Sequence, residues 1–361
     1  MRHSLGPLFR RATVGVLALA AMWAAGGSPS AAPAAAPAPE AERLSFTERY
    51  RALQHGGIVR AANASITCRT AQGPSCSEAQ AGGPGVNGDF DMFYVDVDRD
   101  ANTYNSSRGE VRLPSGSRVT YARLYWGGNL RVGEQKPPQD NGRVLIAEPG
   151  GEYKELLADT TVGHRVMDGM DAFQASADVT RLVREGGAGL YTVAQINIAM
   201  GRSTAGAWGG WTLVVAYENP AEPLRHLAVW DGFTPLAGTG QEIGLGGLDF
   251  AAGAWGRAGL VTYNGDRGTG GDSLTVTAGQ SGSALSNGAN PRDDVLNSTI
   301  SEPGADASRV PAYTNTLGYD SDVFDLGSAL QHSGDQATFR IQSQQDAAWA
   351  GVLFAAVDAR R

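Results

Sequence analysis

The stretch Trp211-Thr-Leu-Val-Val-Ala-Tyr-Glu-Asn-Pro-Ala-Glu-Pro-Leu-Arg-His-Leu-Ala-Val-Trp-Asp-Gly-Phe233 decides the fold class. Two short apolar runs, rich in valine, leucine and aromatic residues, flank a turn that carries Asn219, Pro220 and Pro223. Proline removes a backbone donor and asparagine bonds its own backbone, so such a cluster ends one strand before the next begins. The stretch therefore predicts two antiparallel strands joined as a hairpin.

The same pattern recurs along most of the chain, where short apolar runs alternate with clusters of Gly, Asn, Asp and Pro. Further strands are expected at 91–98, 119–126, 143–147, 173–178, 189–199, 259–263, 273–277, 338–342 and 350–357. Helical patterns are confined to residues 40–53 and to 178–184, the latter capped by Asp178 and ended by Gly186 and Gly187. We therefore predict an all-β protein, built as two jelly-roll-like antiparallel β-sandwich domains.

The first 32 residues have the layout of a secretory signal peptide. Arg10 and Arg11 precede an apolar run at 12–25 that is too short for a permanent membrane span. The Ala/Pro-rich segment 33–44 is expected to be a flexible tether. Because the Gly-rich stretch 234–247 is typical of a connection, we place one sandwich domain at 45–235 and the second at 236–361. No sorting motif or C-terminal membrane segment follows, so we expect a secreted protein in the medium or at the cell surface.

The charge of the chain argues against two classes of partner. The sequence has 37 acidic and 29 basic residues, a formal net charge of −8, and only Lys136 and Lys154 as lysines. A cleaved signal peptide would remove three arginines and leave the remainder more acidic. Such a surface repels nucleic acid and anionic lipid, so we expect neither nucleic-acid binding nor membrane insertion of the mature form.

The two cysteines, Cys68 and Cys76, lie close together in a chain expected to reach an oxidising compartment. A disulfide that closes a short loop is the interpretation we favour over free thiols. Two cysteines without neighbouring histidines are a poor zinc site. We expect the pair to be a structural cross-link.

Eight segments of the chain form a recognisable pattern: 93–100, 122–128, 173–180, 210–217, 229–233, 264–274, 296–301 and 315–324. Together they resemble a group of secreted actinobacterial surface proteins, which includes the head region of repeat-bearing adhesin-like proteins. The segments cover most of the chain from about Ala61. The resemblance implies a surface-binding role and carries no catalytic residue over to this sequence. Unlike many such proteins, this chain shows no repeats or wall anchor before Arg361.

Two groups of acidic residues in turn-rich segments are candidate calcium sites, and calcium is the one cofactor the sequence suggests. The main candidate combines two Gly-rich loops and comprises Asp266, Asp272, Asn315, Asp320 and Asp322. The second comprises Asp96, Asp98 and Asp100, whose alternation resembles a calcium loop but lacks the glycine and glutamate of an EF-hand. Asp and Asn also make turns by bonding their own backbone, and this alternative stays open for both groups.

Aromatic residues offer a candidate ligand surface. Trp208 and Trp255 lie in Gly/Ala-rich segments, where exposed rings could stack on sugars, whereas Trp211 and Trp230 lie on apolar strands and are expected in the core. Core packing is an equal alternative for the first two.

The sequence gives little support for catalysis. Neither serine segment completes a Gly-x-Ser-x-Gly motif, and the histidines are scattered. We therefore predict a non-enzymatic, adhesion-type binding protein for a glycan, a cell-wall polymer or a surface protein, stabilised by calcium. A secreted polysaccharide-acting hydrolase and a structural surface-coat component are the alternatives.

Overall fold

The computed structural model describes residues 37–69, 74–236, 238, 240–279, 281–304 and 308–360. One long strand, β2 (Leu44–Ala64), organises the fold. Its first part, to His55, pairs antiparallel with β13 (Leu224–Pro235). Its second part, from Gly56, pairs antiparallel with β12 (Gly209–Glu218). A single strand therefore belongs to two different groups of strands.

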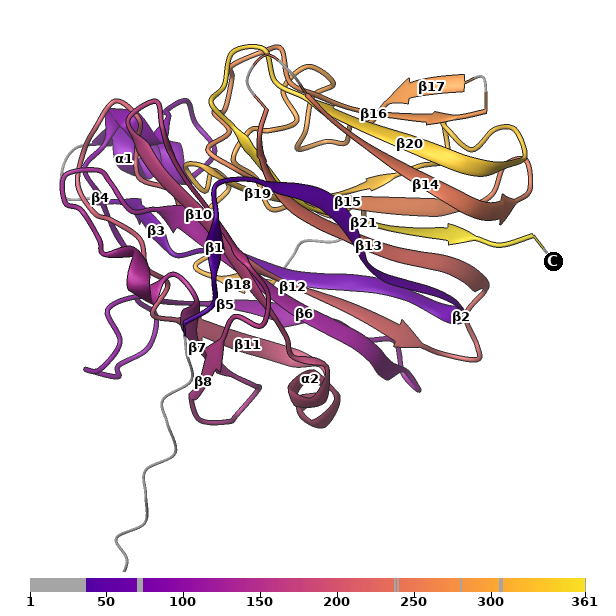
Figure 1. Ribbon diagram of the computed structural model, residues 1–361, viewed down its shortest axis with the longest axis horizontal. Helices are drawn as coiled ribbons and strands as arrows, with labels where there is room; N and C mark the ends of the chain where they lie inside the picture. Colours follow the sequence, from indigo (N-terminus) through magenta and orange to yellow (C-terminus); the bar gives the residue numbers. More distant parts are fainter. Residues whose placement is uncertain are drawn as a thin grey trace, which may run out of the picture. The chain divides into compact units, whose positions relative to one another are not determined.

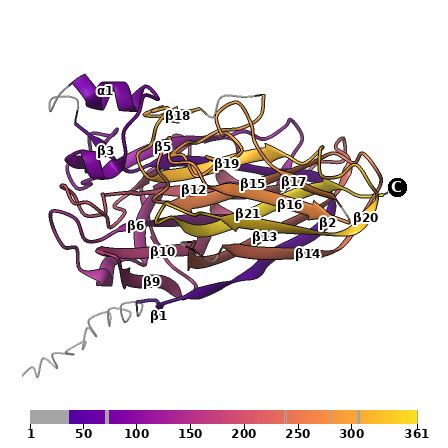
Figure 2. The same ribbon diagram turned by 90° about the horizontal axis from the view of Figure 1, so that it is seen from above.

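These groups form a ten-stranded sheet in the order β1-β9-β10-β6-β12-β2-β13-β21-β15-β19 (Figures 1 and 2). The remaining bounds are β1 (Glu40–Ala41), β9 (Val162–Met167), β10 (Met170–Asp178), β6 (Arg118–Asn129), β21 (Trp349–Asp358), β15 (Gly256–Tyr263) and β19 (Tyr319–Asp325). All pairs are antiparallel except β1 with β9, which is parallel.

Three smaller sheets and two short helices complete the described elements. A five-stranded sheet has the order β18 (Arg309–Val310), β5 (Ser106–Val111), β11 (Gly189–Ala194), β7 (Arg143–Ala147) and β8 (Lys154–Leu157). A four-stranded sheet has the order β14 (Gln241–Phe250), β20 (Gly334–Gln342), β16 (Ser273–Ala278) and β17 (Ser281–Ala284). β3 (Ile66–Cys68) pairs with β4 (Met92–Tyr94), and the α-helices are α1 (Pro74–Gln80) and α2 (Thr180–Gly186), with single 3-10 turns at Asn87–Asp89 and Pro138–Asp140. Neither helix is long and apolar enough to cross a membrane.

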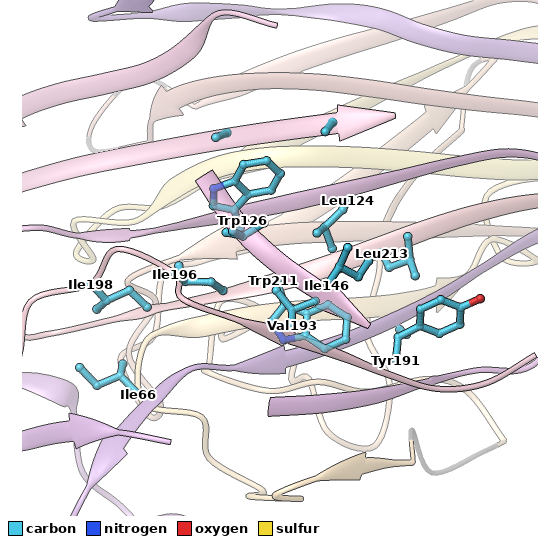
Figure 3. Packing of buried hydrophobic residues seen from close by; sticks show 14 of the residues in the cluster. Ile66, Leu124, Trp126, Ile146, Tyr191, Val193, Ile196, Ile198, Trp211 and Leu213 are labelled. Atoms are coloured by element: carbon cyan, nitrogen blue, oxygen red, sulfur yellow. The ribbon is translucent and has the colours of Figure 1, made fainter. Parts of the chain in front are cut away.

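Two separate cores lie under the smaller sheets. The five-stranded sheet packs on β6 and β12, and its residues Ile146 and Tyr191 belong to one buried cluster with Leu124 and Leu213 (Figure 3). The four-stranded sheet packs on β13, β21, β15 and β19 through a second cluster. Each arrangement is a β-sandwich, and the structure confirms the predicted all-β fold.

A third cluster contains the residues that alternate with those of the first two. Val214 of β12 belongs to it while its neighbours Leu213 and Val215 belong to the first core. Val229 of β13 belongs to it while Trp230 belongs to the second. Successive side chains of a strand point to opposite faces, so both parts of the ten-stranded sheet are covered on both faces. This burial is why the central strands are continuous apolar runs.

The predicted hairpin was wrong in its pairing. Residues 211–217 and 227–233 do form strands β12 and β13, but β2 lies between them and bonds to both. The Asn219–Pro223 turn thus separates two strands that enter different sandwiches. The sequence signal located the turn correctly, while the intervening strand comes from a segment more than 140 residues earlier, which local pattern does not reveal.

Three further expectations need correction. Residues 40–53 form strands β1 and β2 rather than a helix, because the partly buried segment is fixed by pairing with β9 and β13. The described part of the tether, 37–44, is therefore not free: Glu40 accepts a hydrogen bond from Asn141 and contacts His164. The connection expected at 234–247 contains the start of β14, whose alternating burial marks a sandwich strand. The segment 1–32, expected to be a signal peptide, lies outside the described residues.

The domain boundary at 235/236 falls between β13 and β14. Strands from both sides of it, β13 on one and β15, β19 and β21 on the other, share the ten-stranded sheet. Residues 37–361 form one compact unit by their contacts. The expected short helix is present as α2, with Asp178 accepting a hydrogen bond from the backbone of Thr180. Cys68 and Cys76 form the expected disulfide.

The change of partner strand along β2 predicts a glycine that does not tolerate substitution. Gly56 has a φ of 139°, and a Cβ added there would lie 1.9 Å from the carbonyl oxygen of Tyr217. We expect Gly56→Ala to lower the free energy of unfolding by about 3 kcal/mol or more, measured by urea denaturation. Gly116→Ala is the control, since Gly116 also has a positive φ but no atom lies within 4 Å of its added Cβ; its cost should be about 1 kcal/mol. Equal losses would contradict the close approach at Gly56.

Candidate functional site

The second sandwich holds a group of aspartates at one end of its core. Asp320 and Asp322 are alternate residues of β19, so their side chains share a face, and each is about 1–2% exposed. That face also carries Phe324 and is directed toward the second core. Two carboxyl groups therefore project into a largely apolar interior.

The segment 297–301 satisfies half of each carboxyl group. Asp320 Oδ1 accepts the backbone N–H of Thr299 at 3.0 Å. Asp322 Oδ1 accepts the backbone N–H of Ser301 at 2.8 Å and the hydroxyl of Thr299 at 3.1 Å. The Oδ2 atoms of both aspartates are buried and have no hydrogen-bond partner in the structure. Burying such an atom without a partner costs about 1–3 kcal/mol, and more when it is charged.

Four further aspartates lie in neighbouring loops. The backbone N–H of Asp266 donates to Asp346 Oδ2, and that of Gly268 donates to Asp294 Oδ2, both at 3.0 Å. Asp272 is 1% exposed, and both of its carboxyl oxygens are buried without a partner, as is one oxygen each of Asp266 and Asp294. We call these six residues the aspartate cluster: Asp266, Asp272, Asp294, Asp320, Asp322 and Asp346.

Burial and mutual repulsion raise the pKa values throughout the cluster. Burial, followed by the charge of Asp346, raises the pKa of Asp266 to about 7. Burial raises the pKa of Asp272 to about 6 and that of Asp346 to about 8. Burial and the neighbouring Asp322 hold the pKa of Asp320 well above its ordinary value. Such shifts report the cost of placing negative charge where neither water nor a cation compensates it.

The structure brings four of the five residues of the main calcium prediction together. Asn315 is not among them: its Nδ2 donates to the Gly85 carbonyl and its Oδ1 accepts the N–H of Leu317, a turn bond of the kind left open as the alternative. Asp294 and Asp346 were missed, because each is an acid in a loop with no pattern that ties it to the others. Among the described residues no group of three or more His, Cys, Asp or Glu that could hold a metal ion is found.

The second calcium candidate forms a self-contained turn. Asp98 Oδ1 accepts the N–H of Asp100 at 2.8 Å and the hydroxyl of Thr103 at 3.0 Å, while Asp98 Oδ2 accepts the Tyr153 hydroxyl. Burial raises the pKa of Asp98, but these hydrogen bonds outweigh it and hold the pKa below its ordinary value. Asp96 accepts the hydroxyl of Ser106 at 2.7 Å. The acids of this loop thus have donors for partners.

The two tryptophans proposed for sugar stacking differ in the exposure of their rings. Trp208 is fully buried and packs against Tyr263 with ring centroids 5.7 Å apart, so it cannot stack on a ligand. The glycines around it allow close packing in the third core rather than exposure. Trp255 is 41% exposed, and the guanidinium of Arg225 lies 4.3 Å from its ring centroid. Only Trp255 presents ring surface to solvent.

A polar cavity of about 920 Å³ lies beside the aspartate cluster. Its lining includes two arginines, one glutamate and several hydroxyl and amide side chains, and no aromatic ring. The described lining residues are Arg267, Asn287, Gly288, Ala289, Thr299, Ile300, Ser301, Glu302, Pro303, Gly304, Arg309, Ala312 and Thr314. We call it the arginine pocket. Sequence reasoning missed it, because its walls come from four separate loops.

The arginine pocket and the aspartate cluster share a wall. Thr299 and Ser301 line the pocket, and the same two residues donate to Asp320 and Asp322. Arg267 follows Asp266 directly and its charge acts on Asp294. The pocket wall is therefore hydrogen-bonded to the cluster behind it.

Comparisons with known proteins add little. No family model matches the sequence, and no curated protein matches it. The solved structures with some similarity include PNGase F, a glycosylasparaginase from Flavobacterium meningosepticum, at 12% identity over 74% of this chain and 95% of that chain. A recombinant N-glycanase F is 14% identical over the same shares. Both TM-scores are 0.19, too low to carry an argument about fold or function.

The raised pKa values predict a pH-dependent stability in buffer free of divalent cations. A carboxyl group whose pKa is raised on folding stabilises the protein below its unfolded pKa, near 3.9, and that stability is lost as pH rises through the folded value. For Asp272, Asp266 and Asp346 the loss should begin near pH 4 and be complete at about pH 6, 7 and 8, respectively. We expect the melting temperature to drop across this range.

The variant Asp346→Asn isolates the contribution of the cluster. It removes a carboxyl group whose pKa is raised to about 8 and keeps an acceptor for the N–H of Asp266. Its melting temperature should decline less steeply with pH than that of the unaltered chain. Burial lowers the pKa of His164, but its hydrogen bonds with Asp171 and Glu40 outweigh burial and raise the pKa above its ordinary value. The contribution of His164 to the pH dependence of stability is the same in both proteins. Parallel pH profiles would contradict the role of the cluster.

Proposed function

We propose that this chain is a secreted, non-enzymatic binding protein that takes an acidic glycan, a polysaccharide with carboxylate or phosphate groups, into the arginine pocket. The single observation that carries the proposal is the pair of arginines, Arg267 and Arg309, in one polar cavity of a chain with net charge −8. Arginine presents a planar fork of donors that matches carboxylate and phosphate oxygens.

Arg267 has a hydrogen-bond donor that is available to a ligand. Its Nη1 is shielded from solvent and makes no hydrogen bond within the described structure. A buried donor of this kind gains fully from an acceptor supplied by a ligand, because its cost of desolvation has already been met on folding. Arg309 is held by a hydrogen bond from its Nη2 to the Tyr313 carbonyl, which fixes the direction of its guanidinium.

The rest of the lining suits a sugar. Ser301 and Thr314 line the cavity with hydroxyl groups that can bond to sugar hydroxyls, while Asn287 is held by hydrogen bonds to Ser301 and Val323. The volume of the cavity lies near the upper end of the range of about 300–1,000 Å³ for small-molecule sites. A polymer residue with a charged substituent would therefore fit with the charge at the arginines.

The pocket supports binding better than hydrolysis. Glycoside hydrolysis uses two carboxyl groups that face each other across the scissile bond. Glu302 is the one carboxylate among the described lining residues. The aspartates behind the wall are engaged with the backbone of 299–301 rather than part of the lining. This arrangement favours a receptor for a polymer over a hydrolase, and the N-terminal pattern supports a place outside the cytoplasm.

Substitution of Arg267 tests the proposal. Loss of a charge-assisted contact should weaken binding of an acidic polysaccharide such as polygalacturonate by about tenfold or more in Arg267→Gln, measured by isothermal titration calorimetry. Teichoic acid serves as the phosphate-bearing probe and dextran as the neutral one. Binding of either acidic polymer should weaken as salt rises, since exposed charges are screened.

Arg292→Gln is the matched control. Arg292 is exposed, lies in the same part of the chain and does not line the pocket. It should bind like the unaltered chain. Equal binding of dextran and polygalacturonate, or equal affinity of Arg267→Gln and Arg292→Gln for the acidic polymers, would overturn the proposal. Release of sugar from any of the polymers would favour the hydrolase alternative.

A further inference from the structure

The aspartate cluster has a surplus of negative charge that its surroundings leave uncompensated. Asp322 has Arg60 as a counter-charge, since the buried Arg60 acts on it. The charged groups that act most strongly on Asp320 are all acidic: Asp322, Asp272 and Asp346. Isolated carboxylates in a protein interior are costly unless they are paired, protonated or bound to a metal. Asp320 therefore lacks a cationic counter-charge among the groups that act most strongly on it, and a proton or a cation from solution would supply one.

An independent polar group points to the same place. Thr262 of β15 is fully buried, and its Oγ1 has no hydrogen-bond partner in the structure. Thr262 lies directly opposite Asp320 in the β15–β19 pair, so both side chains project from the same face of the sheet. The hydroxyl of Thr262 and the Oδ2 atom of Asp320 are therefore neighbouring buried oxygens, and neither has a hydrogen-bond partner. This pair indicates a position between them for an atom that contacts both.

The backbone of the loop 264–272 passes close to Asp320. An added Cβ at Gly265 would lie 2.0 Å from the carbonyl oxygen of Leu296 and 2.9 Å from Asp320 Oδ2. Glycine at this position therefore lets the loop and the Leu296 carbonyl approach the buried carboxyl group. Asp272 closes the other end of the same loop, with both carboxyl oxygens buried and unbonded.

We infer that a hard divalent cation, calcium, binds between Asp272 and Asp320, with the hydroxyl of Thr262 as a neutral ligand. Two carboxylates neutralise the ion, and the remaining positions are filled by water and by neutral oxygens. Calcium accepts six to eight oxygen ligands in flexible geometry, including hydroxyl and carbonyl oxygens. The inference concerns the cation alone and does not depend on what the arginine pocket binds.

The site has a structural consequence for the pocket wall. The cation joins β19, through Asp320, to the loop 264–272 that carries Arg267. The other oxygen of Asp320 accepts the N–H of Thr299 in the wall itself. Calcium therefore holds two walls of the arginine pocket at a fixed separation. The metal supports the pocket and is not part of its lining.

Calcium titration of the whole chain tests the inference. The chain is stripped with EDTA, dialysed, and titrated with calcium chloride alone at pH 7.5 in a calorimeter. We expect saturable binding at one site, with a dissociation constant of roughly 10 μM to 1 mM, the range of extracellular calcium modules and sensors. The melting temperature should rise by about 5 °C or more at saturation. A flat titration together with an unchanged melting temperature would overturn the inference.

Two variants locate the site. Asp272→Asn should weaken calcium affinity by at least tenfold. Thr262→Val keeps the shape of the side chain and all charges, and it should weaken calcium affinity severalfold while leaving the metal-free chain folded. This milder variant keeps the test decisive if Asp272→Asn fails to fold. Unchanged affinity in Thr262→Val and in any folded Asp272→Asn protein would overturn the proposed position.

Two controls separate this site from the other acidic loop and from the pocket. Asp100→Asn, in the loop whose acids accept donors of their own, should bind calcium like the unaltered chain. Arg267→Gln should lose acidic glycan but keep the calcium response. A chain that binds calcium without binding glycan leaves this inference standing and removes only the proposed function. Loss of calcium binding in Asp100→Asn but not in Asp272→Asn would move the metal to the other loop.

Discussion

The structure depends on one strand that pairs on both sides of a bend. β2 bonds to β13 before Gly56 and to β12 from Gly56 onward, so it links the strands of the first sandwich to those of the second. The close approach of Gly56 to the Tyr217 carbonyl lets the chain change neighbours without losing its ladder of hydrogen bonds. Unpaired backbone groups in this interior would be costly, so the continuity of β2 fixes where every central strand can lie.

That arrangement explains why a polar site can exist inside the second sandwich. The central strands are covered on both faces, and most of their side chains are apolar. At the end of β15 and β19 the pattern changes to Thr262, Asp320 and Asp322, and the loops 264–272 and 297–301 cover these residues. The carboxyl groups are thus shielded from water by the same packing that stabilises the fold. Their raised pKa values follow from the shielding, not from an unusual local sequence.

The site joins two kinds of chemistry through a few residues. Thr299 and Ser301 donate to the aspartates on one side and line the arginine pocket on the other. Negative charge is concentrated behind the wall and positive charge in front of it, at Arg267 and Arg309. The charge of Arg267 acts on Asp294, while its Nη1 makes no hydrogen bond within the described structure.

The sequence alone determined the all-β class, the turn at Asn219–Pro223, the Cys68–Cys76 disulfide and four of the six aspartates, because each depends on local pattern or on chemistry between near neighbours. The sequence led us to pair β12 with β13 instead of β2, and to expect a helix at 40–53, where β1 and the first part of β2 lie. It also did not reveal Asp294, Asp346 or the arginine pocket. Only the tertiary structure decided that Trp208 is core and that Asn315 is a turn residue. The physical reason is that strand pairing and burial join residues far apart in the chain, and the alternation of side chains in one strand does not specify which other strand will cover them.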